Sequence, residues 1–169
     1  MSEYFFPEAF VEDGLGEGRV ICLTGTRAYV SPARGLAGPE CGKVFSSVPF
    51  EKLVEFLDLE KSCFLKDVII VYMDEGDRYR GFYVRKGESV RLLEVSGSII
   101  TIHKKEGEQV EAHEKIGFIV TNKREVRVIK SPVKGILLAV IDLTWESPEK
   151  VIMVLTSEQP REIIVGKNP

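Results

Sequence analysis

The stretch that decides the fold runs from Gly97 to Val140 and reads GSIITIHKKEGEQVEAHEKIGFIVTNKREVRVIKSPVKGILLAV. Apolar residues recur at alternate positions in short runs, and turn residues separate these runs. Runs with a period of two that end at Gly, Pro or Asn are typical of β-strands. The segment Ile119–Val128 predicts a tight hairpin whose polar tip is Asn122-Lys123-Arg124. The sequence therefore predicts a small all-β unit with a lysine exposed at a hairpin tip.

These residues resemble the biotinyl/lipoyl-attachment domains, which are barrel-sandwich modules that carry a cofactor on a hairpin lysine. The matching positions follow the family's order of a glycine turn, a valine, apolar residues, Thr-Asp-Lys, Val-x-Val and Ser-Pro before a glycine. They are Gly107, Val110, Ile116, Ile119, Thr121-Asn122-Lys123, Val126-Arg127-Val128 and Ser131-Pro132-Val133-Lys134-Gly135. The resemblance implies that Lys123, counted forward from Gly107, stands at the modified position of lipoyl domains.

The sequence departs from the family pattern around this lysine. Asn122 stands where the family has aspartate, Val120 replaces the acidic residue before the motif, and no methionine flanks Lys123. The chain between the Val-x-Val and Ser-Pro motifs is one residue longer than in lipoyl domains. This predicts a bulge near Ile129, with both valines of the motif facing inward. A backward count would instead place Arg124 at the acceptor position, and a guanidinium has no amine to acylate.

Composition narrows the class of protein. The chain has 169 residues and a formal charge of −3, which gives no overall argument for nucleic acid or an anionic membrane. No apolar run approaches the roughly 20 residues that a bilayer requires, and the first residues lack the pattern of a signal peptide. Three widely spaced cysteines, Cys22, Cys41 and Cys63, form no metal or disulfide pattern. We therefore expect a cytoplasmic protein with reduced thiols and no membrane association.

The remaining chain predicts further strands and one helix. We expect residues 1–18 to form a leading segment that phenylalanines anchor on the core. Residues 31–47 are rich in Gly and Pro, which predicts a long loop. A helix is expected over 47–59, since Ser47 can cap it and apolar residues recur at helical spacing. Strands are expected at 19–23, 27–30, 68–73, 79–85, 89–95, 98–102, 136–140, 150–155 and 162–165. Those at 98–102 and 136–140 belong to the opening stretch, and the others lie outside it.

The sequence shows no pattern of catalytic residues. His103 and His113 lie near the glycine turn among lysines and glutamates, which predicts solvated turn residues rather than metal ligands. No nucleophile elbow, phosphate-binding loop or paired carboxylates stand out. We leave open whether the protein is an enzyme and favour a non-catalytic role. An enzyme would have its site in the amino-terminal domain, with the loop over 31–47 as its lid.

One charged feature stands out at the predicted hairpin. Its cations are Lys123, Arg124, Arg127, Lys130 and Lys134, and Glu125 is the single acid among them. Such a surface can meet an anionic protein or an RNA backbone. It can also protect a strand edge from aggregation. Aromatic residues are not interleaved with these cations, so we do not expect a nucleic acid partner.

Together these patterns predict an α+β, mostly β, protein with two domains. Residues 1–79 form an amino-terminal β domain covered by one helix, and 80–169 form the biotinyl/lipoyl-like barrel-sandwich domain. The whole chain also resembles an uncharacterised archaeal protein family that carries this module. We favour a protein-interaction module with Lys123 unmodified and no cofactor. The alternatives are a swinging-arm carrier with lipoate or biotin on Lys123, and the enzyme above. The sequence names no partner and sets no oligomeric state.

Overall fold

The protein is mostly β, and its strands form two units. The structure is a computed structural model that describes residues 7–12, 18–25, 27–32, 41–73, 79–143, 149–156 and 161–167. One unit comprises residues 1–57, 64–88 and 161–169, and the other comprises 58–63 and 89–160. The sequence predicts a single boundary at residue 79, whereas the two units of the structure interleave along the chain. They do so because the strands at 79–84 and 161–167 pair with strands of the first unit.

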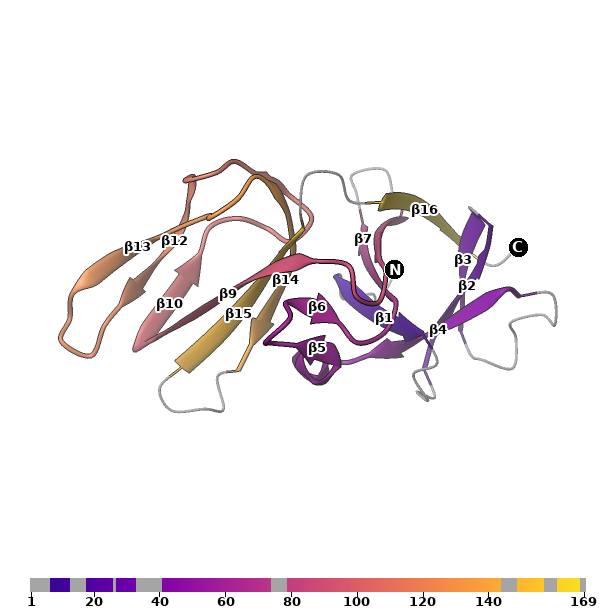
Figure 1. Ribbon diagram of the computed structural model, residues 1–169, viewed down its shortest axis with the longest axis horizontal. Helices are drawn as coiled ribbons and strands as arrows, with labels where there is room; N and C mark the ends of the chain where they lie inside the picture. The colour runs from indigo at the N-terminus through magenta and orange to yellow at the C-terminus, as the bar shows by residue number, and fades with distance from the viewer. Residues whose placement is uncertain are drawn as a thin grey trace. The chain divides into compact units, whose positions relative to one another are not determined.

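Seven strands of the first unit close into a barrel (Figure 1). Their order is β1-β4-β2-β3-β16-β8-β7, and β7 pairs back to β1. Only β16 and β3 run parallel among these neighbours. The strands are β1 (Glu8–Glu12), β2 (Val20–Thr24), β3 (Arg27–Ser31), β4 (Lys43–Val48), β7 (Val68–Met73), β8 (Tyr79–Val84) and β16 (Arg161–Lys167). Closure leaves this sheet without a free edge strand.

Alternate residues of the barrel strands meet in one apolar cluster. Its buried members are Phe10, Ile21, Leu23, Ala28, Phe45, Ile69, Val71, Tyr79 and Val165. They come from all seven strands, so no strand can be removed without opening the cluster. The strands predicted at 19–23, 27–30, 68–73 and 79–85 are therefore confirmed as barrel elements. Gly25 has a φ of 61°, the left-handed conformation that glycine adopts without steric cost.

Of two predictions for the amino-terminal region, one was incomplete and one was wrong. Phe10 anchors the leading segment in the core as predicted, but this segment also contains β1, which pairs with β4 on one side and β7 on the other. The loop expected over 31–47 contains most of β4, which pairs with β1 and β2. Residues 33–40 of that expected loop lie outside the described residues, and so the proposed lid is not described there. Pairing on both sides overrides the glycine and serine content of the β4 segment.

The predicted helix is a short 3₁₀ helix, η2 (Phe50–Phe56). Ser47 belongs to β4 and caps nothing, while Pro49 precedes the helix and its carbonyl accepts a hydrogen bond from Lys52 N at 2.9 Å. Leu53 is fully buried, as the helical spacing required. The helix is short because the residues before it pair in β4. The residues after it form β5 (Leu57–Asp58), which pairs with β6 (Cys63–Phe64).

The second unit contains two sheets around one core (Figure 1). One sheet has the order β10-β12-β13, and the other has the order β11-β14-β15-β9. The strands are β9 (Val90–Gly97), β10 (Ile99–Ile102), β11 (Gln109–Val110), β12 (Lys115–Val120), β13 (Val126–Lys130), β14 (Gly135–Asp142) and β15 (Glu149–Thr156). The core contains Val95, Val110, Ile116, Ile129, Leu137, Val151, Met153 and Leu155, which come from both sheets. The two sheets therefore form a sandwich.

The hairpin β12–β13 lies where the sequence predicted it, but its faces are reversed. Val126 and Val128 are exposed, whereas Ile129 is 4% exposed and belongs to the core. The bulge also differs from the prediction. The pairing register shifts between Lys115 and Gly117 of β12. The extra residue is therefore Ile116 of β12, and not a residue of β13, which contains Ile129. The expected inward phase of the two valines was wrong because both faces of this strand pair are apolar.

The cysteines also differ from the expectation of reduced thiols. Cys22 of β2 and Cys41 form a disulfide that closes a loop of sequence separation 19, while Cys63 is a free, buried thiol. The antiparallel pairing of β2 and β4 brings the two partners together, since Cys22 pairs with Val44. Sequence spacing alone could not reveal this neighbourhood.

Candidate functional site

The tip of the β12–β13 hairpin is a compact, hydrogen-bonded turn. Arg124 N donates to Thr121 O at 2.9 Å, and Thr121 N donates to Glu125 O at 2.8 Å. The Thr121 hydroxyl accepts from Glu125 N at 3.1 Å, and Ser98 Oγ donates to Asn122 Oδ1 at 2.5 Å. These bonds hold the backbone on both sides of the tip.

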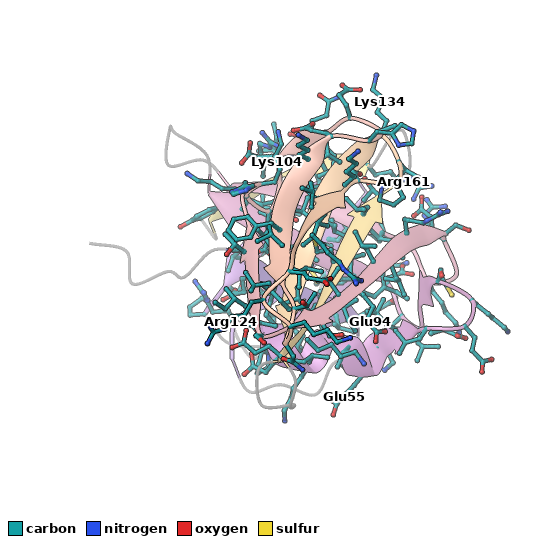
Figure 2. All side chains as sticks on the ribbon, turned by 90° about the vertical axis from the view of Figure 1, so that its left-hand side faces the viewer. Glu55, Glu94, Lys104, Arg124, Lys134 and Arg161 are labelled. Carbon is teal, nitrogen blue, oxygen red and sulfur yellow. A yellow bond between two sulfur atoms is a disulfide. The ribbon has the colours of Figure 1, made fainter. Side chains whose placement is uncertain are left out.

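Lys123 and Arg124 are exposed at this turn. Lys123 is the third residue of the turn that the Arg124-to-Thr121 hydrogen bond closes. Arg124 has a φ of 63°, which is uncommon for a residue other than glycine. Figure 2 shows Arg124 at one end of the second unit's strands, with Lys104 and Lys134 towards the other end. The hairpin thus places both cations where a partner can reach them.

The structure divides the predicted cationic surface into paired and unpaired residues. Arg127 lies 3.6 Å from Glu125, and Lys134 lies 3.9 Å from Glu111. Lys123, Arg124 and Lys130 form no ion pair within the described ranges of the chain. Lys130 instead stands opposite Lys115 on β12. Like charges directly opposite each other in a sheet are destabilising.

Three turns share one hydrogen-bond pattern, which was not predicted from the sequence. In each, the first residue's N–H donates to a glutamate carboxylate three residues on, as in Arg85–Glu88, Lys105–Glu108 and Glu111–Glu114, at 2.7 to 2.9 Å. The third residue has a positive φ, and it is Gly87, Gly107 and His113 respectively. The sequence signal that could have predicted these turns is a repeated Gly-Glu or His-Glu pair, followed two residues later by Val or Ile. These turns hold the ends of β8, β11 and β12.

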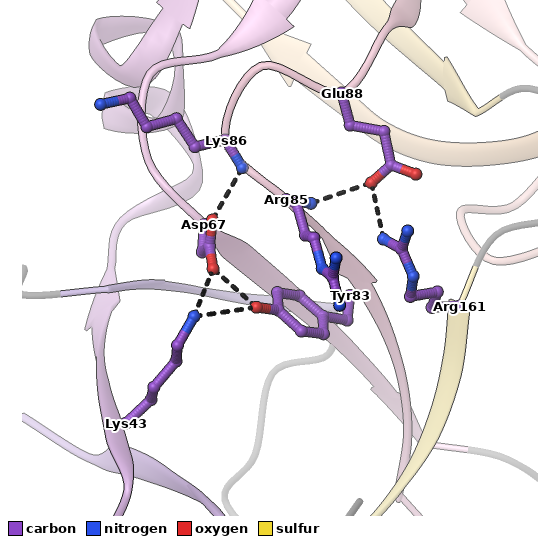
Figure 3. Close-up of polar contacts among 7 residues, drawn as sticks. All are labelled: Lys43, Asp67, Tyr83, Arg85, Lys86, Glu88 and Arg161. Carbon is purple, nitrogen blue, oxygen red and sulfur yellow. Dashed lines mark hydrogen bonds and ion pairs between the residues drawn. The ribbon is translucent and has the colours of Figure 1, made fainter. Parts of the chain in front are cut away.

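The barrel unit contains a polar cluster that sequence reasoning missed (Figure 3). Asp67, just before β7, is buried and accepts three hydrogen bonds. Lys43 Nζ of β4 lies 3.0 Å from Asp67 Oδ2, and the Tyr83 hydroxyl of β8 donates to the same oxygen at 2.6 Å. Lys86 N donates to Asp67 Oδ1 at 2.7 Å. One carboxylate therefore joins three parts of the barrel that are distant in sequence.

The cluster's protonation states follow from these contacts. Burial alone would raise the pKa of Asp67, but the bonds from Lys86 N, Tyr83 and Lys43 bring it below its ordinary value. The bonds to Asp67 and Tyr83 raise the pKa of Lys43. Burial and the bond to Asp67 raise the pKa of Tyr83. A charged lysine and a neutral tyrosine are poor nucleophiles. The hydrogen bonds to the shared carboxylate link β4 and β8 to the start of β7 and so stabilise the barrel.

A second carboxylate has the opposite character. Glu106, in the turn before β11, is partly buried, and its Oε2 accepts a hydrogen bond from Val140 N at 3.0 Å. Burial raises the pKa of Glu106 to about 7, and the single backbone donor offsets this only in part. Glu106 thus covers the edge of β14 and changes charge near neutral pH.

Other predicted candidates are solvated. His103 and His113 are both exposed, as expected for turn residues, and the His103 ring packs at a centroid distance of 5.6 Å from Phe118. Across the described residues, no three His, Cys, Asp or Glu side chains come together in a metal-binding group. None of the helices described in the structure is long and apolar enough to cross a membrane.

Comparison with known proteins places this chain in a family. Its residues 4–158 match the model of a family described as "Uncharacterized protein conserved in archaea" (DUF2118). A search of curated proteins finds no match. The match covers the seven-stranded barrel except β16, together with the whole sandwich. The chain therefore belongs to the DUF2118 family of archaeal proteins.

Proposed function

We propose that this protein is a non-catalytic binding module that contacts another protein through the β12–β13 hairpin. The observation that carries the proposal is the hydrogen-bonded tip, where Lys123 and Arg124 are exposed without an ion pair among the described residues. A fixed backbone reduces the entropy lost on binding. Exposed cations would also attract an anionic partner. Lys123 is unmodified in this proposal, and no cofactor is involved.

We also propose that the second unit is a barrel-sandwich hybrid of the biotinyl/lipoyl-like class. Two sheets around one core, a lysine at the tip of the β12–β13 hairpin and the glycine turn at Gly107 support this assignment. The compartment we propose is the cytoplasm. Disulfides are rare in cytosolic proteins outside hyperthermophiles, so the Cys22–Cys41 disulfide agrees with this compartment only in a hyperthermophilic host.

The second candidate function is a carrier with lipoate or biotin on Lys123. Its support is the position of Lys123, which is exposed in a four-residue turn between two paired strands. An acylating enzyme would need such access to the lysine amine. Arg124 beside it and the altered neighbours Val120 and Asn122 favour the unmodified form.

Affinity capture from the native host tests the binding module. The bait variants are Lys123→Gln/Arg124→Gln and the control Lys52→Gln, which alters an exposed cation on η2. We expect one partner to be retained by the wild type and the control and lost by the tip variant. Peptide mass spectrometry on the same native protein would show a bare Lys123. A lipoyl or biotinyl adduct on that peptide would replace this proposal with the carrier.

A further inference from the structure

The outer face of the β10-β12-β13 sheet is apolar and exposed. Strand pairing aligns Ile99, Val120 and Val126 in one row across the three strands. The next row contains Phe118 and Val128 beside Thr101. Ile99, Val126 and Val128 are 54%, 66% and 50% exposed, respectively. The inner face of the same sheet supplies Ile100, Ile102, Ile119 and Ile129 to the sandwich core. Contiguous exposed apolar patches commonly mark protein–protein interaction sites.

Cations lie at both ends of this outer valine face, which we define as Ile99, Phe118, Val120, Val126 and Val128. The paired Lys115 and Lys130 follow the second row, and Lys123 and Arg124 stand at the hairpin tip beyond the first row. The span from the first valine of β13 to its last residue is about 13 Å, at about 3.3 Å per residue. No described acid pairs with these four cations, so a partner would have to supply the negative charges.

Strand β13 is also an edge strand. In the described part of the chain it pairs only with β12, and it contains neither proline nor glycine. Its outer backbone groups can therefore accept another strand. A second copy of β13 paired in parallel and in register would bring Arg127 against Arg127 and Lys130 against Lys130. An acidic strand would instead place opposite charges beside these cations, so cross-strand charge pairing favours an acidic strand.

We propose that β13 binds an extended acidic segment of another protein, which adds to the sheet as a further strand. Alternate apolar residues of this segment would lie beside Val126 and Val128, and its acids would meet Lys130 at one end and Arg124 at the other. Backbone hydrogen bonds supply affinity in such strand addition, and alternate side chains supply specificity. The inference rests on the proposed function, because it names the class of partner that the binding module takes.

A synthetic peptide tests the proposal with the whole protein. The probe is fluorescein-labelled Asp-Glu-Val-Thr-Val-Thr-Val-Glu-Asp, and its matched control replaces every acid with lysine. We expect the acidic peptide to bind in fluorescence anisotropy and the lysine peptide not to bind. Added salt should weaken binding, since exposed charges are screened. Hydrogen exchange should slow at backbone amides of β13 when the acidic peptide is bound.

Two substitutions locate the binding surface. Val128→Ser should weaken binding about fivefold, because it removes apolar contact area. Lys130→Glu should weaken it about tenfold through charge repulsion. Ile164→Ser and Lys52→Glu are the matched controls, since both alter exposed residues of the barrel unit. Both controls should bind as the wild type does. All four positions are exposed, and circular dichroism checks that each variant is folded.

The proposal is overturned by any of three results. These are no binding at about millimolar peptide, equal binding of the lysine peptide, and binding without added protection of β13 amides. Tighter binding of a single-stranded RNA oligonucleotide on this surface would also overturn it. The proposed function is tested separately. If the tip variant loses its native partner while Val128→Ser and Lys130→Glu keep theirs, this inference fails and the binding module stands.

Discussion

Asp67 in the barrel and Glu106 in the sandwich are both withdrawn from solvent, yet their pKa values move in opposite directions. Asp67 receives hydrogen bonds from a lysine, a tyrosine and a backbone N–H, whereas Glu106 receives one from a backbone N–H. Burial by itself would raise the pKa of both carboxylates. The number and charge of the donors therefore decide which carboxylate stays ionised at neutral pH.

The lysines of the two regions also differ in whether other side chains bind them. Lys43 is held by Asp67 and Tyr83 within the barrel, so its charge is used in the fold. Lys123 and Lys130 have no such partner among the described residues, and Lys130 even stands opposite another lysine. The barrel cluster thus stabilises the protein, while the hairpin keeps its charge available to a partner. Four predictions test this contrast.

The largest effect is expected for Asp67→Ala, which removes the shared acceptor of the barrel cluster. We expect the free energy of unfolding to fall by about 3 kcal/mol, because three donors lose the buried carboxylate that they share. Urea denaturation at neutral pH measures the loss, and the exposed Glu55→Ala serves as the control. The lowered pKa of Asp67 means that its contribution is present above the unfolded-state pKa and is lost as the pH falls through the folded-state pKa. A difference between variant and wild type that persists unchanged in strong acid would contradict this account.

Glu106→Gln should reveal the opposite pH dependence. Between the ordinary value of 4.5 and about 7, the folded protein keeps a proton on Glu106 that the unfolded chain releases. The wild type therefore loses stability as the pH rises through this window. Glutamine still accepts the Val140 N–H and does not titrate. Above pH 7 we expect the variant to gain about 2 kcal/mol relative to the wild type, after discounting the shift for partial exposure. Parallel pH–stability curves from thermal melts would show that Glu106 does not titrate as described.

Thr121→Val should loosen the hairpin tip without unfolding the protein. It removes the hydroxyl that accepts Glu125 N, and a neutral hydrogen bond contributes about 1 kcal/mol. Amide hydrogen exchange should become faster at residues 121–125 in particular. Thr101→Val, on the outer face of β10, is the matched control and should leave exchange at the tip unchanged. Equal exchange in both variants would mean that other contacts hold the turn.

The smallest effect is expected at the outer valine face. Val128→Thr should change the free energy of unfolding by less than about 0.5 kcal/mol, because the side chain is half exposed and threonine keeps β propensity. Chemical denaturation provides the measurement. A loss above about 1 kcal/mol would show that Val128 stabilises the fold. The contrast between the barrel cluster, which stabilises the protein, and the hairpin, which is available to a partner, would then disappear.

Local sequence signals predicted much of the second unit. Alternating apolar residues and turn residues placed the strands near 89–95, 98–102, 150–155 and the hairpin around Lys123, and the structure has strands there. These signals succeed because a strand's period and a turn's φ requirements act over a few residues. The role of Lys123 remains a prediction.

The inward face of β13 could not be predicted in the same way. Val126 and Val128 alternate with Arg127 and Ile129, and only the packing against the opposite sheet makes Ile129 the core residue. A single bulge residue changes the phase of a strand. The sequence suggested an extra residue in β13, whereas the structure places Ile116 as the extra residue of β12.

By itself, the sequence determined a mostly β protein with a lysine hairpin and a cationic tip, because periodicity, turn residues and charge are local properties. Only the tertiary structure decided that β1 and β4 close a barrel, that Cys22 meets Cys41 and that Asp67 joins Lys43, Tyr83 and Lys86. These contacts link residues distant in the chain. Strand pairing brings them together, and neither spacing nor composition encodes which strands will pair.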